Sequence, residues 1–283
     1  MTFVVGFPPD GSGHAVLHLA AMLARSGGED LLVTTIVPAP WAPGPARVDA
    51  EYQAELTRAA HEALELARSR LPEGAEARYV VHHARSVPSG LLELAERESA
   101  ELLVLGSALH GPHGQVTLGS VSDQLVHSSP LPVALAPRGF RCRSGCPVRR
   151  VSAAFGGTDV ALVEAAVRVA ARIGAQVRVV SFAVRPRAPL QAGVGASAED
   201  PVVEQWERDV AAALGGSYEM ALGRGATWEE ALDDVEWTEG DVLVVGSSQL
   251  GPIARVFLGS RSSKIVRHSP VPCVVVPREA LQE

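Results

Sequence analysis

Residues 104–138 read VLGSALHGPHGQVTLGSVSDQLVHSSPLPVALAPR, and residues 244–278 read VVGSSQLGPIARVFLGSRSSKIVRHSPVPCVVVPR. At a constant offset of 140 and without a gap, 16 of these 35 positions are identical, from Val104/Val244 to Arg138/Arg278. Self-similarity at a fixed period is the signature of a repeated structural unit. The chain is therefore a duplication, and we divide it into copy one (residues 1–138) and copy two (residues 148–283).

Each copy alternates apolar runs with segments of helical periodicity. The predicted strands are FVVGF, LLVTTIV, RYVVHH, ELLVLG and LPVALA in copy one, and RRVSAAF, QVRVVSFAV, SYEMAL, DVLVVG and VPCVVV in copy two. Helical patterns separate them, such as AELTRAAHEALELARSRL from Ala54. Strands that are apolar throughout and alternate with helices are typical of a parallel sheet covered on both faces. The sequence predicts two tandem α/β domains, each with an open five-stranded sheet.

The last predicted strands, Leu131–Ala136 and Val271–Val276, each contain a proline, Pro132 or Pro272. Because proline cannot complete a ladder of hydrogen bonds, each strand is expected at a sheet edge. An exposed apolar edge promotes aggregation unless it is covered. We therefore expect the two edges to pair with each other, so that one chain forms a pseudo-dimer. The linker from Gly139 to Val148, which contains no acidic residue, is long enough to allow this pairing. A further homodimer remains open.

The charge and the apolar runs of the sequence exclude several classes of function. The 283 residues carry a net charge of −7, which argues against a nucleic-acid or anionic-membrane binder that relies on bulk electrostatics. No apolar run approaches the roughly 18–20 residues of a membrane span. The first residues, MTFVVGF, lack the basic region of a signal peptide and lead directly into a strand. We expect a cytoplasmic protein without nucleic-acid or membrane partners.

In both copies a strand ends at a glycine, Gly106 or Gly246, and enters a loop that leads to Gly119-Ser120 or Gly259-Ser260 at the start of a helix. A helix N-terminus offers free backbone N–H groups and the positive end of a dipole to an anion. Glycine lets the backbone approach a phosphate closely. The alternative is that these glycines and serines serve only as turn and N-cap residues.

The spacing Gly106…Gly119-Ser120, the short helix after it and the Pro-Val strand resemble the signature of the universal stress protein family. That signature is a glycine, two residues, a second glycine, nine residues, and glycine with serine or threonine. The resemblance implies the strand order 3-2-1-4-5, an adenine-nucleotide alpha-hydrolase-like fold, and phosphate binding by this loop in members that bind ATP. It also implies that an aspartate after the first strand, here Asp10, contacts the adenine side.

The two copies depart from this signature differently. Its second glycine falls on Leu109 in copy one and on Gln249 in copy two, and Gly111 or Gly251 follows two residues later. Copy one reaches Asp10 through an extra Pro8-Pro9, whereas copy two has Gly156-Gly157-Thr158 in place of Asp-Gly-Ser. Asp159 follows and is interpreted as a helix cap. We therefore favour copy one over copy two as the site of ATP binding.

The predicted nucleotide-binding residues come from both copies. They are Asp10, Gly106, Gly111, Gly119 and Ser120 in copy one, and Gly246, Gly251, Gly259 and Ser260 in copy two.

Motifs of enzymes are weak in this sequence. A Walker pattern needs a lysine after its last glycine, but Val121 and Arg261 follow the Gly-Ser pairs, and Lys264 is the only lysine. His110 and His113 could contact a phosphate or a metal, although loop histidines are the simpler interpretation. The acidic stretch from Thr227, TWEEALDDVEWTEGD, fits the solvated face of a helix better than a metal cluster.

The three cysteines do not form an extracellular disulfide framework. Cys142 and Cys146 flank the linker sequence RSG, where a regulatory disulfide or half of a metal site is an alternative to a structural role. Cys273 lies in an apolar strand and is interpreted as a small core residue.

Three functions remain after the sequence analysis. The favoured one, which the resemblance implies, is a non-enzymatic stress-response regulator that responds to bound adenine nucleotide. The second is the same scaffold with degenerate sites that acts through protein contacts alone. The third is a slow ATPase, for which the sequence offers no clear catalytic base.

Overall fold

The computed structural model describes residues 1–39, 46–108, 110–157, 160–184, 201–214, 218–247 and 259–281. Copy one contains the elements β1 (Thr2–Gly6), α1 (His14–Gly27), β2 (Asp30–Pro38), α2 (Ala46–Arg70), β3 (Ala77–Ala84), α3 (Val87–Arg97), β4 (Ala100–Gly106), α4 (Ser120–Ser128) and β5 (Val133–Ala136). Strand and helix alternate in the order that the periodicity predicts.

Copy two repeats this order. Its elements are β6 (Arg150–Ala154), α5 (Val160–Ile173), β7 (Gln176–Val184), α6 (Pro201–Leu214), β8 (Glu219–Gly225), α7 (Trp228–Asp233), β9 (Asp241–Gly246), α8 (Ser260–His268), β10 (Cys273–Val276) and the short helix η1 (Glu279–Leu281). The acidic stretch forms α7 as predicted, with Ala231 and Leu232 buried and the glutamates exposed.

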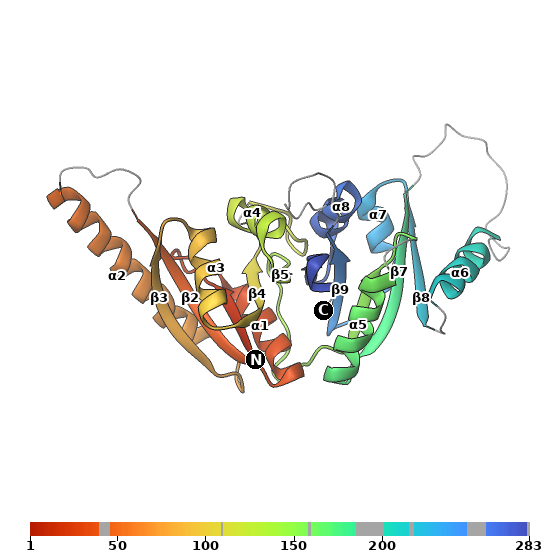
Figure 1. The fold of residues 1–283 in the computed structure, drawn as a ribbon, viewed down its shortest axis with the longest axis horizontal. Helices are drawn as coiled ribbons and strands as arrows, with labels where there is room; N and C mark the ends of the chain where they lie inside the picture. Colours follow the sequence, from red (N-terminus) through yellow and green to blue (C-terminus); the bar gives the residue numbers. More distant parts are fainter. Residues whose placement is uncertain are drawn as a thin grey trace.

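The ten strands of the described residues belong to one sheet, in the order β3-β2-β1-β4-β5-β10-β9-β6-β7-β8. Each half has the predicted order 3-2-1-4-5 and is parallel throughout. The halves meet through the antiparallel pair β5–β10, in which Cys273 lies opposite Leu135 and Val275 opposite Val133. The expected pairing of the two edges is confirmed. The two predicted sheets are therefore halves of one continuous sheet (Figure 1).

The positions of the two prolines correct the predicted strand bounds. Pro132 and Pro272 lie just before β5 and β10 and not inside them, because these strands begin at Val133 and Cys273. The proline carbonyl oxygens accept hydrogen bonds from the N–H groups of Leu103 and Leu243, at 3.0 and 2.9 Å. Each proline thus takes part in the ladder as an acceptor only, at a position just before the strand, where its missing N–H costs no hydrogen bond within the strand.

Both faces of the sheet are covered by helices. Successive residues of β1 point to opposite faces, so Phe3 and Val5 belong to the core cluster that includes α1 and α5 residues, while Val4 belongs to the cluster that includes α3 and α4 residues. One core therefore lies under α1, α2, α5 and α6, and the other under α3, α4, α7 and α8. Figure 1 shows α2 and α6 at the outer ends of the molecule and the two halves meeting in the middle.

The linker after β5 holds the two copies together at the amino-terminal end of the strands. The N–H of Val148 donates to Ser26 Oγ at 2.7 Å, and the N–H of Arg143 donates to Glu239 Oε1 at 2.8 Å. The linker therefore contacts α1 of copy one and the segment before β9 of copy two.

None of the helices in the described part of the chain is both long and apolar enough to cross a membrane.

Candidate functional site

A cavity of about 360 Å³ lies beyond the carboxyl ends of β1 and β4. The order of strands reverses there, because β1 leads outward to β2 while β4 starts the other side of the sheet. Crevices at such switch points are the usual ligand sites of open α/β sheets. Four predicted residues line the cavity: Asp10, Gly106, Gly119 and Ser120. The structure thus places Asp10 and Gly106 around the same crevice, as expected.

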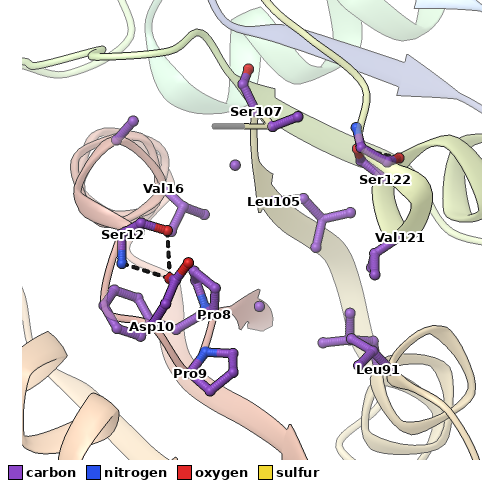
Figure 2. Close-up of a pocket in the computed structure, with 18 of the residues that line it drawn as sticks. Pro8, Pro9, Asp10, Ser12, Val16, Leu91, Leu105, Ser107, Val121 and Ser122 are labelled. Atoms are coloured by element: carbon purple, nitrogen blue, oxygen red, sulfur yellow. Dashed lines mark hydrogen bonds between the residues drawn. The ribbon is translucent and has the colours of Figure 1, made fainter. Parts of the chain in front are cut away.

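Asp10 is held in a turn between β1 and α1. Its Oδ1 accepts hydrogen bonds from the N–H of Ser12 at 2.9 Å and from Ser12 Oγ at 2.6 Å (Figure 2). Gly11 adopts φ +71°, a conformation that favours glycine, and its carbonyl accepts from Arg70 Nη1 at 3.1 Å. This geometry fixes the carboxylate at the exposed rim of the cavity and leaves Asp10 Oδ2 for another donor.

The first turn of α4 forms the other side of the cavity. The N–H of Gly119 donates to Ser122 Oγ at 2.8 Å, and this hydroxyl donates to the carbonyl of Gly119 at 3.1 Å. The next N–H groups, of Ser120, Val121 and Ser122, belong to the first turn, where no preceding helical carbonyl can accept from them. The positive end of the helix dipole is added to these donors, so the wall attracts an anion.

Gly106 and Gly119 are not explained by packing or by backbone conformation. Neither has a positive φ, and a Cβ would come no closer than 3.8 Å to Val16 at Gly106 and 3.5 Å to Ala108 at Gly119. Gly6 differs, because a Cβ there would lie 2.9 Å from Leu105 Cδ2. The missing side chains at Gly106 and Gly119 leave room beside the backbone at the polar end of the cavity.

The remaining lining includes a set of apolar side chains and a cation. Its apolar side chains come from several elements and include Val16, Ile36, Val87, Leu91, Leu105 and Val121. Figure 2 shows Leu105, Leu91 and Val121 across the cavity from Asp10 and Ser12. Arg138 also lines the cavity and donates to the carbonyl of Gly111. Arg138 was not among the site residues predicted from the sequence, although its repetition as Arg278 was a signal.

Gly111, also predicted to bind nucleotide, has a different role. It is buried and is not among the residues that line the cavity. A Cβ at Gly111 would lie 1.8 Å from Thr117 Oγ1 and 2.4 Å from Thr117 Cβ. The glycine therefore allows the backbone at position 111 to pack closely against Thr117 within the loop. The neighbouring Leu109, where the signature has a glycine, lies outside the described residues.

Copy two keeps the same frame at its matching position. Strand β9 ends at Gly246, and Gly259 precedes Ser260 at the start of α8. A Cβ at Gly246 would meet Leu162 at 3.6 Å, an ordinary contact. Ser262 Oγ donates to the carbonyl of Gly246 at 3.0 Å and so links the helix start to the strand end. Gln249, Gly251, Thr158 and Asp159 lie outside the described residues.

The titratable groups near the copy-one cavity are few. Asp10 is the one carboxylate among the described residues that line it. His113 packs against Gly139, where a Cβ would lie 2.1 Å from His113 Nε2. His82 pairs with Glu93 at 3.1 Å, on β3 and α3. Within the described ranges, no group of three or more His, Cys, Asp or Glu side chains is arranged to hold a metal ion.

The cysteines are buried free thiols. Cys142 Sγ donates to the carbonyl of His18 at 3.2 Å, and burial raises the pKa of both Cys142 and Cys146. Burial also raises the pKa of Cys273 to about 12, in agreement with its predicted place in the core. A raised pKa keeps a thiol protonated and weakly reactive. The two linker cysteines are buried in the core cluster that includes α1 and copy-two residues.

Comparison with known proteins gives the same assignment along the whole chain. The family described as "Universal stress protein family" matches residues 1–137 and again residues 151–277. Universal stress proteins of Mycobacterium tuberculosis (strain H37Rv) and Mycobacterium bovis are each 39% identical over 292 residues, covering 98% of this chain and 100% of theirs.

Solved structures agree on the fold. The crystal structure of a universal stress protein from Archaeoglobus fulgidus matches with a TM-score of 0.60 and 19% identity, and covers 97% of this chain and 98% of that one. Universal stress proteins in complex with cAMP and with dAMP also match, over 38% of this chain with TM-scores of 0.27 and 0.26, a likeness too slight to inform on its ligand. On its sequence and its two family matches, this chain belongs to the universal stress protein family.

Proposed function

We propose that the chain is a non-enzymatic, cytoplasmic stress-response regulator that binds ATP in the copy-one cavity. The observation that carries this proposal is that a Cβ would fit at Gly106 and at Gly119 without a clash, so that packing requires a glycine at neither position. Neither packing nor backbone conformation accounts for the glycines, and both lie beside the N-terminus of α4. A phosphate chain next to this backbone would use that space.

The two ends of the cavity suit the two ends of a nucleotide. The N–H groups of the first turn of α4 and the guanidinium of Arg138 provide positive charge for phosphates. The apolar side chains Leu91, Leu105 and Ile36 offer a surface for a flat base, and Asp10 Oδ2 provides an acceptor at the rim. The volume of about 360 Å³ lies in the range of roughly 300–1,000 Å³ for small-molecule sites.

Regulation without catalysis is supported by the position of Asp10. Its Oδ1 is occupied by two hydrogen bonds from Ser12, and it lies across the cavity from α4, where the phosphates are placed. A general base must come within hydrogen-bond reach of the attacking water. Asp10 therefore serves the base end of the nucleotide rather than hydrolysis.

Native mass spectrometry of the purified chain tests this proposal, because a co-purified nucleotide is observed directly. We expect one ATP per chain, and no release of phosphate when the complex is incubated with a divalent cation. Steady phosphate release would favour the slow ATPase. No nucleotide, together with no heat of binding on titration with ATP, would favour the degenerate scaffold.

A further inference from the structure

A second and larger cavity, of about 670 Å³, lies where the two copies join. It is a groove between α1 and α5, which lie on the same face of the sheet (Figure 1). Copy one contributes Phe3, Leu23 and Leu102, and copy two contributes Val169, Val244 and Val274. We call it the junction groove. None of its lining residues is shared with the nucleotide cavity.

The junction groove exposes apolar surface that the fold leaves uncovered. Among the described residues, the large hydrophobic side chains that are exposed are Met1, Tyr52 and Val169. Val169 lines the groove and is 44% exposed, and Met1 Sδ accepts from Arg172 Nη1, which lines it too. One of these three exposed side chains therefore lines the groove and a second contacts a residue that lines it, and exposed apolar patches commonly mark binding sites.

Charged groups stand at the rim of the groove, and the acids among them are already paired. Glu29 contacts Arg172 Nη2 at 3.4 Å and the amino group of Met1 at 3.6 Å. Glu101 contacts Arg172 Nη1 at 3.6 Å. Arg168, one turn before Arg172 on α5, is exposed and has no ion-pair partner within the part of the chain that the structure describes.

We propose that the junction groove binds a long-chain carboxylate, an amphiphile of the fatty-acid class. Its hydrocarbon chain would lie on the apolar floor between α1 and α5, where water is released from both surfaces. Its carboxylate would pair with the free guanidinium of Arg168, which presents donors in the geometry that a carboxylate matches. A groove of about 670 Å³ lies within the usual range for small ligands.

Such a ligand contacts both copies at once. Its chain would lie against β4 and α1 of copy one and against β9, β10 and α5 of copy two. It would therefore stabilise their relative position without entering the nucleotide cavity. This inference does not depend on the proposed ATP site.

Titration of the full-length chain with dodecanoate, below the concentration at which it forms micelles, tests the inference. We expect saturable binding, followed by calorimetry, and a loss of at least about tenfold in Val169→Trp, which fills the groove from an exposed position. Arg168→Ala should weaken dodecanoate about tenfold and leave dodecanol unchanged, since only the carboxylate needs the guanidinium. Arg208→Ala, an exposed arginine of α6, is the matched control and should bind as the parent does.

Three results would overturn the inference. They are no saturable binding of dodecanoate by the parent chain, equal binding by the parent and both groove variants, and weakening by Val169→Trp without any effect of Arg168→Ala. Sedimentation gives a separate check. A parent chain that dimerises, and a Val169→Trp variant that does not, would assign the groove to a second copy of the chain. Since Arg168 is exposed, its variant keeps the test decisive even if Val169→Trp fails to fold.

Discussion

The two copies build the proposed phosphate end of the candidate site alike and its proposed base end differently. In both, a strand ends at a glycine where a Cβ would meet only ordinary contacts, and a Gly-Ser pair starts the next helix. After the first strand, copy one places the Asp10 turn, whereas copy two has Gly156 and Gly157 with nothing within 4 Å of a Cβ at either. The phosphate end depends on backbone, which the fold supplies twice. The base end depends on side chains, which differ.

The copies also differ at the opposite end of the sheet, where copy two buries charge. Asp241 is 1% exposed and accepts from Arg150 Nε at 3.0 Å and Nη2 at 2.7 Å. Arg178 lies 3.8 Å from the same carboxylate, and burial lowers its pKa. At the matching position of copy one, Glu101 is 40% exposed.

The largest expected effect is therefore that of Asp241→Asn. It leaves two guanidinium groups without their buried carboxylate, and we expect a loss of about 3–5 kcal/mol in the free energy of unfolding. Glu101→Gln, the matched change in copy one, removes an exposed pair and should cost less than about 1 kcal/mol. Urea unfolding of both variants gives the two values. Similar losses would mean that the copies do not differ in this respect.

A smaller effect separates the structural glycine of the copy-one loop from the glycine that faces the cavity. In Gly111→Ala the new methyl group overlaps Thr117, so the free energy of unfolding should fall by about 1–3 kcal/mol. In Gly119→Ala the methyl meets only ordinary contacts, and stability should change by less than about 0.5 kcal/mol. Thermal unfolding of the two variants in the absence of nucleotide is the measurement. The reverse order would remove the reason for placing a ligand at Gly119.

The smallest effect is an acid sensitivity specific to copy one. Burial lowers the pKa of His14 and His18 on α1, with Arg141 adding to both, whereas α5 has no histidine. Below pH 6.5, the ordinary pKa of histidine, the unfolded chain binds protons that the folded chain does not. The contribution of the two neutral histidines to the free energy of unfolding is therefore present above that pH and is lost as the pH falls. Each group adds at most about 1.4 kcal/mol per pH unit.

Urea unfolding between about pH 5 and pH 8 checks this sensitivity in the parent and in a His14→Gln, His18→Gln variant. We expect a shallower dependence of the free energy of unfolding on pH in the variant. An unchanged slope would place the acid sensitivity elsewhere in the chain.

The sequence was sufficient for most of the fold because its signals are local and repeated. Apolar strand runs, helical periodicity and the fixed offset predicted the elements, and the edge prolines predicted the β5–β10 pair. The prolines were wrongly placed inside the strands, since a residue that only accepts a hydrogen bond looks like a strand member in the sequence.

The candidate site was predicted less completely, because it depends on contacts between distant segments. The glycines of the signature look equivalent in the sequence, but only the space around each Cβ separates Gly111 from Gly119. Arg138 and Ile36 reach the cavity from other elements, and only the repetition of Arg138 as Arg278 gave a sign of it in the sequence. The junction groove could not be predicted, because it exists only when α1 and α5 lie on one continuous sheet.

The most direct test of the account compares Gly119→Val with Gly259→Val in calorimetric titrations with ATP. If copy one is the ATP site, the valine at position 119 fills the space that the phosphates need, and binding is lost. The valine at position 259 should leave the affinity of the chain within about twofold, a difference of less than about 0.5 kcal/mol. Equal losses in the two variants, or a loss only in Gly259→Val, would contradict the assignment of ATP to copy one.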